Sequence, residues 1–330
     1  MKFTITNRMQ SSRHLEFQTS QMNKQITKFQ HQVPQHYLRL WFDPENHVWL
    51  HDLLKDKSSP RTTKRILGDD YFYENDAANP TNEIENYLGD IESAVAPLLK
   101  SISKLDPQNL TSSLRPEEAM CEEAARLLSA SGAKKKLLDF ISAQLIRTSR
   151  TVDEIEHSII ASGLSDVEKK LLLQQNRPYE LVKLGMTRLP ARLIDGYKIV
   201  LSYVEDKSLV TSDHPVSEIR TNTNLLPQTV YNVLHKNDTI LSVPLGPNFH
   251  CFLLPDTGAE SIMIQFRKTL ASWTNTPGID SAIVWRKLQP QIIEQLRILH
   301  TGFGRKFLVS KKNEDDLIEN STLIKKSKES

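Results

Sequence analysis

The amino-acid sequence predicts an α+β fold in which a helical N-terminal half packs on a small, mostly antiparallel sheet from the C-terminal half. Before about residue 195, apolar residues recur at helical spacing and capping signals separate the segments. After that point, short β-branched or aromatic runs are bounded by turn residues, which is typical of strands. The change of pattern therefore separates a helical part from a strand-rich part.

A single domain is predicted over residues 29–310, because neither an internal repeat nor a low-complexity linker divides it. Its helical part covers 29–194 and its strand-rich part covers 195–310. Residues 1–28 are rich in Gln, Ser and Thr and predict a flexible lead-in, and charge dominates a predicted tail at 311–330.

The first predicted elements are short. Pro34 suits the first turn of a helix, where its missing N–H costs nothing, and apolar residues follow at helical spacing (Tyr37, Leu38, Trp41 and Phe42). A brief strand is predicted at 48–50. Residues 55–65, with two serines, a proline and two threonines, predict a loop, and the aromatic cluster 71–73 favours a strand.

Longer helices are predicted next. An apolar stripe predicts a helix over 82–103 (Ile84, Leu88, Ile91 and Val95). Pro-Glu-Glu at 116–118 opens a helix that runs to about residue 130, and the next helix covers 133–149. Two further helix starts are predicted from pairs with capping-box spacing (Thr151 with Glu154, and Ser165 with Glu168).

The C-terminal part is predicted to contain several short strands and one helix. The strands are expected at 197–204, 208–210, 239–243, 249–254 and 261–266. Residues 288–299 predict a helix, at least after Pro290. These strands are expected to form the sheet on which the helices pack.

The composition describes an ordinary soluble protein. The chain has 330 residues, of which 38% are hydrophobic and 25% charged, and a formal net charge of +2. This balance argues against an overall basic coat for nucleic acid but leaves a local basic groove open. Two isolated cysteines, Cys121 and Cys251, form neither a disulfide framework nor a zinc spacing.

The sequence also excludes several classes. No apolar stretch approaches the roughly 20 residues that span a bilayer, and the N-terminus lacks the apolar centre of a signal peptide. We therefore expect a cytoplasmic protein without a membrane partner. ATPase, dinucleotide oxidoreductase, α/β-hydrolase and zinc-finger functions are disfavoured, because a P-loop, Gly-x-Gly-x-x-Gly, Gly-x-Ser-x-Gly and Cys/His zinc signature are all absent.

Polar residues inside otherwise apolar segments are the strongest functional signal. They occur in 31–42 (HQVPQHYLRLWF), 140–147 (FISAQLIR) and 209–216 (LVTSDHPV). Burying an unpaired polar or charged group costs several kcal/mol, so such residues destabilise a hydrophobic core unless each is paired. We predict that the three segments form the walls of one pocket.

The order of the motifs resembles the family called domain of unknown function 4238. The motifs are HQVPQHYLRLWF, VWLHDL, YFYEND, IENYLGDIE, AQLIRTS, LVTSDHPV and VPLGPN, and the resemblance covers about residues 29–300. The sequence departs from the family pattern at His36, where Phe or Tyr is common, and at Thr148-Ser149, where Thr-Pro is frequent. The resemblance implies site positions rather than an activity, at the residues that match (His31, Pro34, Tyr37, Leu38, Glu85, Glu92, Gln144, Arg147, Ser212, Asp213, Pro215, Pro244 and Leu245).

Glu85 and Glu92 are the predicted metal ligands. They are seven residues apart on the predicted helix, so they fall within about 20° of each other, and they border its apolar stripe. Such a carboxylate pair is able to hold a divalent cation or to share a proton. The alternative is a solvated flank beside a core stripe.

Gln144 and Arg147 lie on the predicted helix 133–149, with Gln144 inside its apolar sector and Arg147 at the edge. Arginine offers a rigid fork of donors that suits carboxylate or phosphate. The alternative is a structural ion pair in which Arg147 neutralises Glu85 or Glu92 and ties two helices together. Both interpretations are compatible with the sequence.

The remaining candidates come from loops and strand ends. Asp213 follows an apolar strand and suits a metal ligand, a general base or a hydrogen-bond acceptor, or else caps a turn. His31 suits proton transfer because its pKa lies nearest neutrality, or else it caps a short helix. We assign His31, Arg147 and Asp213 to catalysis, and Tyr37, Gln144 and Ser212 to substrate binding.

The leading hypothesis is a metal-dependent phosphodiesterase or nuclease-like enzyme that acts on nucleic acid, in a defence or toxin setting, with Mg²⁺ or Mn²⁺. Carboxylates for a metal, an arginine for phosphate and a histidine for proton transfer are the ingredients of phosphodiester hydrolysis. The alternative is a non-catalytic module that binds a ligand or partner in the same pocket, with Trp41 and residues 71–73 as walls. A purely structural polar network is the third interpretation.

Overall fold

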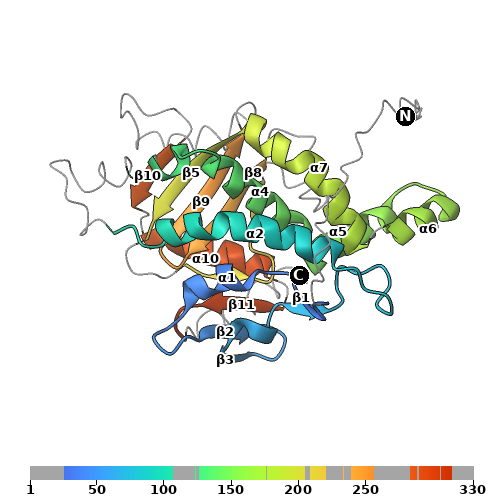
Figure 1. Ribbon diagram of the computed structural model, residues 1–330, viewed down its shortest axis with the longest axis horizontal. Helices are drawn as coiled ribbons and strands as arrows, with labels where there is room; N and C mark the ends of the chain where they lie inside the picture. Colours follow the sequence, from blue (N-terminus) through green and yellow to red (C-terminus); the bar gives the residue numbers. More distant parts are fainter. Residues whose placement is uncertain are drawn as a thin grey trace.

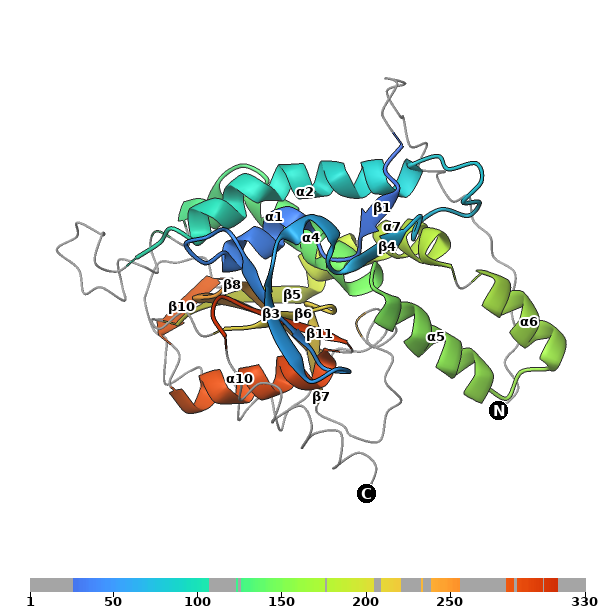
Figure 2. The ribbon, with the colours of Figure 1, turned by 90° about the horizontal axis from the view of Figure 1, so that it is seen from below.

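The computed structural model describes residues 26–106, 123, 126–175, 177–204, 209–220, 233, 239–255, 283–287, 290–304 and 306–313. In Figures 1 and 2 these residues form a sheet with helices on both of its faces. The fold is α+β, as predicted. Two predicted elements fall largely or wholly outside the described residues: the helix at 116–130 and the strand at 261–266.

The central sheet has five strands in the order β10-β5-β9-β8-β7. All neighbouring strands are antiparallel except β10 and β5, which are parallel. The predicted strands at 197–204, 239–243 and 249–254 are confirmed as β5, β8 and β9. The strand bounds are β5 Tyr197–Tyr203, β7 Ser217–Arg220, β8 Thr239–Gly246, β9 Phe249–Pro255 and β10 Ile283–Lys287.

The two faces of this sheet join different hydrophobic clusters, because successive strand residues point to opposite sides. In β5, Ile199 and Leu201 pack with the helices α2 (Glu83–Ile102), α4 (Ala133–Ile146) and α7 (Pro178–Gly196). Val200 packs on the other side with Leu296 of α10 (Pro290–Phe303). The sheet is therefore the middle layer of three, as Figure 2 shows.

The helical layer follows the local sequence pattern closely. The predicted helix over 82–103 is confirmed as α2, which buries its apolar stripe. The neighbouring α4 and α7 approach each other closely at Gly185, where an added Cβ would lie 2.7 Å from Cδ1 of Ile146. A larger residue at position 185 would therefore force the Ile146 side chain to shift in this packed contact.

The helices α5 (Ser149–Ala161) and α6 (Asp166–Gln175) extend from this layer as an arm (Figure 1). The capping box at the start of α6 is confirmed, since the Ser165 amide donates to Glu168 Oε2 at 2.9 Å. The predicted start at Thr151 is wrong. Its hydroxyl donates to the Leu145 carbonyl at 2.6 Å, inside a helix that has already begun at Ser149.

The prediction of a helical N-terminal half is wrong, because strands precede the helices. β1 and β4 form a two-stranded sheet, and β2 and β3 join β11 and β6 in a four-stranded sheet of order β3-β2-β11-β6. The predicted strand at 48–50 is part of β2. The strand bounds are β1 Phe29–His31, β2 Val48–Asp52, β3 Lys57–Arg61, β4 Gly68–Asp70, β6 Thr211–Ser212 and β11 Phe307–Ser310.

Three further segments differ from the local prediction. β3 lies in the stretch predicted as a loop, and as an edge strand it tolerates Pro60 and needs no buried face. The stretch 71–73 forms a turn rather than a strand, with Tyr71 at a φ of 55°. Residues 209–210 precede the short strand β6 rather than forming one.

The short helix predicted after Pro34 is present as α1 (Gln35–Leu38), with Pro34 as its N-cap residue, followed by the 3₁₀ turn η1 (Arg39–Trp41). In both ribbon views α1 lies beside α2. Within the described ranges, no helix combines the length and apolar character that a membrane span requires.

Candidate functional site

Arg147 is the centre of a buried polar cluster at the end of α4. It caps the C-terminus of this helix, and only 1% of its surface is exposed. Its Nη1 donates to Glu92 Oε1 at 2.5 Å, its Nε to the Tyr73 hydroxyl at 3.1 Å, and its Nη2 to the His31 carbonyl. The structural ion pair that the sequence analysis offered as an alternative is thus present between Arg147 and Glu92, and it connects α4 with α2.

Tyr73 completes the cluster from the turn after β4. Its hydroxyl lies 3.1 Å from the Arg147 carbonyl and 3.2 Å from that of His31, and its backbone amide donates to Gln30 Oε1 at 2.7 Å. Each guanidinium nitrogen of Arg147 therefore has a protein partner. The cluster stabilises the junction of β1, α2 and α4.

The charges of this cluster are strongly coupled. Burial alone would raise the pKa of Glu92, but Arg147 and the nearby His36 outweigh burial and hold this pKa below its usual value. Burial likewise opposes the charge of Arg147, yet Tyr73 and Glu92 keep its pKa above the usual value. Both groups are ionised at neutral pH.

Glu85 lies on the same helix, two turns before Glu92. Its Oε2 is buried and has no hydrogen-bond partner among the described residues. Burial raises the pKa of Glu85 to about 7, although the positive charge of Arg147 opposes this rise. Glu85 is therefore the one carboxyl of the cluster that exchanges a proton near neutral pH.

His31 contributes its backbone and its ring to different partners. Its carbonyl accepts from Arg147, whereas its ring Nε2 lies 3.2 Å from the Thr63 carbonyl. Burial, together with the charge of Arg147, lowers the pKa of the His31 ring. The ring is therefore neutral at pH 7.

Gln144 is fully buried one turn before Arg147. Neither Nε2 nor Oε1 has a hydrogen-bond partner among the described residues, although such a buried amide usually finds one. It shares a helix face with Phe140, whose ring contacts those of His36 and Tyr37. Gln144 is thus the least satisfied polar side chain near the cluster.

The other predicted site residues form a second group around β6. The Tyr37 hydroxyl donates to the Pro244 carbonyl at 2.6 Å and lies 2.9 Å from Thr211 Oγ1. Ser212 Oγ donates to the His214 carbonyl at 2.8 Å, and Asp213 Oδ2 accepts from the Lys306 amide at 2.8 Å.

The structure thus brings together His31, Glu85, Glu92 and Arg147, with Gln144 one turn before Arg147 on α4. Tyr37, Ser212 and Asp213 bond instead to β6, β8 and the start of β11. The two groups meet where His214 Nδ1 lies 2.6 Å from Thr148 Oγ1, next to Arg147. In the part of the chain that the structure describes, no three or more His, Cys, Asp or Glu side chains are arranged to hold a metal ion.

A basic cleft opens beside the cluster, and the sequence analysis missed it. The cavity has a volume of about 530 Å³. Its basic side chains come from η1, the end of α2 and the segment after β11 (Arg39, Lys100, Lys104 and Lys311), and no Asp or Glu is among the described residues that line it. The remaining lining residues are His36, Leu40, Ala96, Leu99, Ser103, Pro247 and Asn248.

His36 connects the cleft with the buried cluster. It lines the cavity, and its Nδ1 lies 3.7 Å from Glu92 Oε2. His36 is one of the two places at which the sequence departs from the pattern of the family that it resembles. The spacing of Lys100 and Lys104 by one helical turn was the only local signal for the cleft, because its other cations are distant in the sequence.

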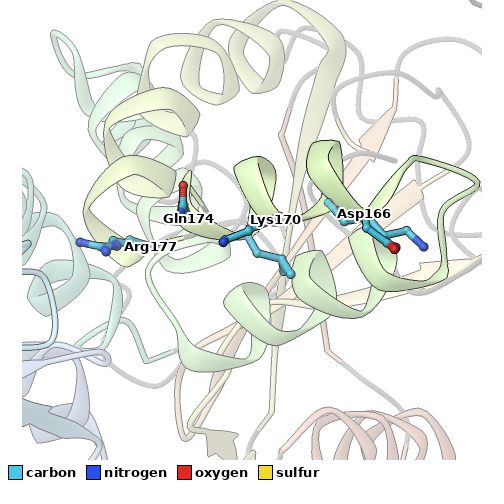
Figure 3. Close-up of a pocket in the computed structure, with 6 residues that line it drawn as sticks. Asp166, Lys170, Gln174 and Arg177 are labelled. Carbon is cyan, nitrogen blue, oxygen red and sulfur yellow. The ribbon is translucent and has the colours of Figure 1, made fainter.

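A second basic surface lies on the arm. Figure 3 shows Asp166, Lys170 and Gln174 on α6 and Arg177 at the start of α7, and Lys169 and Leu173 of α6 complete the lining. This surface comes almost entirely from a single helix and carries its own carboxylate. It therefore provides a natural comparison for the cleft.

Comparison with known proteins gives one match. The model of a family described as "Protein of unknown function (DUF4238)" matches residues 30–269. The match includes all eight predicted site residues and, in the cleft, Arg39, Lys100 and Lys104, but not Lys311. No curated protein and no solved structure matches the chain.

Proposed function

Because the chain belongs to the DUF4238 family, whose description names no activity, we propose a function from its own residues: it binds a phosphate-bearing anion in the basic cleft. The observation that carries this proposal is the set of cations that lack a counter-ion. Among the described residues, Arg39, Lys100 and Lys104 have no carboxylate partner, and no Asp or Glu lines the cleft beside them.

Unneutralised cations around one hollow repel each other. Such an arrangement raises the local positive potential, and a bound anion relieves the repulsion. Lys311 also lines the cleft, and its Nζ donates a hydrogen bond to the Phe42 carbonyl at 2.6 Å. The proposal corresponds to the ligand-binding module that the sequence offered as its alternative, but it uses a different cavity.

The first prediction concerns these lysines. Pyrophosphate and tripolyphosphate are expected to bind, and the double substitution Lys100→Gln/Lys104→Gln to weaken binding by about tenfold or more. Each lost charge-assisted hydrogen bond removes about 1.5–3 kcal/mol. Isothermal titration calorimetry at 50 and 200 mM salt measures both the affinity and its salt dependence.

A matched control uses the arm. Lys169→Gln/Lys170→Gln removes the same charge from the surface of α6 and is expected to leave the affinity unchanged. Equal weakening by the two double variants would mean that net charge, rather than the cleft, attracts the anion.

Metal-dependent hydrolysis of phosphodiester bonds in nucleic acid is a second proposal. It is favoured by the unpartnered Oε2 of Glu85 and by the contact between His36 in the cleft wall and Glu92. Magnesium is commonly held by one or two carboxylates, with the remaining ligands supplied by waters and substrate phosphates. Glu85 and Glu92 would be the carboxylates in such a site.

Under this second proposal, the purified protein cleaves RNA or DNA in the presence of Mg²⁺ or Mn²⁺, and a chelator stops the cleavage. Glu85→Gln is expected to reduce the rate by about 100-fold or more, and Asp213→Asn tests the catalytic role assigned to Asp213. Glu83→Gln on the same helix is the control. Cleavage that survives both Glu85→Gln and Asp213→Asn would refute these roles.

A further inference from the structure

We infer that the anion in the basic cleft is a nucleoside polyphosphate, an assignment that rests on the proposed anion-binding function and names its ligand class. The lining of the cleft combines cationic side chains, apolar side chains and an asparagine amide. A ligand that carries both a multiply charged chain and a planar, hydrogen-bonding group matches this combination.

The apolar part of the lining favours a ligand that carries an organic group over an inorganic ion. Leu40 of η1, Ala96 and Leu99 of α2, and Pro247 of the β8–β9 turn contribute this part. A hydrated phosphate gains nothing from such a surface, whereas a nucleobase buries its faces against apolar side chains. The volume of about 530 Å³ lies in the range of small-molecule sites, roughly 300–1,000 Å³.

Asn248 supplies a neutral polar group to this lining. The residue is only 6% exposed, yet it lines the cleft. An asparagine amide carries both donors and an acceptor, which allows paired hydrogen bonds to the edge of a base. This amide is therefore available to a ligand.

The turn that carries Asn248 is held rigidly. The Asn248 carbonyl accepts a hydrogen bond from the Val204 amide at 2.8 Å, and the Pro247 carbonyl accepts one from the Leu209 amide at 3.0 Å. Because both carbonyls are fixed by neighbouring backbone, the wall is preorganised and loses little entropy when a ligand binds.

The charges indicate several phosphates rather than one. Lys100 lies in the last turn of α2 and Lys104 in the turn that follows it, where the helix dipole is negative and repels anions. Phosphates here must therefore be held by side chains, in contrast to a P-loop. Arg39, Lys100 and Lys104 carry three positive charges, which suit the several negative charges of a di- or triphosphate.

The test compares nucleoside triphosphates with tripolyphosphate. By isothermal titration calorimetry, at least one of ATP, GTP, CTP and UTP is expected to bind about tenfold or more tightly than tripolyphosphate, a difference of about 1.4 kcal/mol. Asn248→Ala is expected to remove most of this difference while changing the tripolyphosphate affinity by less than about twofold. Asn79→Ala, outside the cleft, is the control.

The outcomes separate the two proposals. Equal affinity for tripolyphosphate and all four nucleotides refutes the nucleoside assignment and leaves anion binding intact. Failure of both classes of compound to bind refutes both proposals. A single-stranded oligonucleotide that binds more tightly than every mononucleotide also refutes the assignment, because the ligand is then a polymer.

Discussion

Replacing Arg147 with methionine is expected to lower the free energy of unfolding by about 3–5 kcal/mol, because removing one partner of a buried ion pair leaves the other charge uncompensated. Glu92 loses its 2.5 Å partner, and the Tyr73 hydroxyl and His31 carbonyl each lose a donor. Methionine keeps most of the aliphatic packing, so the loss reports mainly the polar contacts. Urea denaturation at pH 7.5 measures the change.

A double-mutant cycle identifies the source of this loss. The variant Arg147→Met/Glu92→Met removes both charges and is expected to recover part of the stability. Arg126→Met breaks an exposed pair with Glu123 and is expected to cost less than about 1 kcal/mol. A change below about 1 kcal/mol in Arg147→Met would contradict the assignment of Arg147 as the centre of the cluster.

The second large effect arises from buried histidines between the central sheet and α10. Ser242 Oγ lies 2.9 Å from His250 Nε2 and 3.3 Å from His300 Nε2, and Ser217 Oγ lies 3.0 Å from His300 Nδ1. His214 is buried nearby, and none of the three rings is more than 1% exposed. Burial lowers the pKa of all three, to about 3 for His300.

The protein is therefore expected to lose stability steeply as the pH falls below 6.5. A histidine with a lowered folded-state pKa binds its proton more readily in the unfolded state, so its contribution is complete above pH 6.5. As the pH falls below this value, each such histidine loses its contribution to the free energy of unfolding at about 1.4 kcal/mol per pH unit. Glu85, with its pKa raised to about 7, acts in the opposite direction. The net loss for these groups is about 3 kcal/mol per pH unit.

Urea denaturation at pH 7.5, 6.5 and 5.5 measures this slope. His300→Gln is expected to reduce the slope by about 1.4 kcal/mol per pH unit, because one buried imidazole no longer titrates. His157→Gln, at an exposed position of α5, is the control. An unchanged slope in His300→Gln would show that other groups cause the acid sensitivity.

The candidate site could be predicted only in part. The polar residues inside apolar segments were a sound signal, since Arg147 and Gln144 are fully buried and His31, Glu85 and Glu92 lie around Arg147. The signal does not distinguish a buried side chain that is paired from one that faces a ligand. Arg147 is paired at every nitrogen, and the open cavity lies on the other side of His36.

The sequence by itself determined the elements whose stability is local. The apolar stripe of α2, the capping box at Ser165 and Glu168, and the β-branched runs of β5 and β8 all depend on residues a few positions apart, so their periodicity is visible in the chain. Helix and strand propensities act at the same short range.

Only the tertiary structure decided the pairing of β2 with β11, the partners of Arg147 and the basic cleft. β2 and β11 are separated by more than half of the chain, and the cations of the cleft extend from Arg39 to Lys311. Strand pairing and electrostatic energy depend on distance in space, which the order of residues does not give. The cleft forms where α1, η1 and the end of α2 meet the β8–β9 turn.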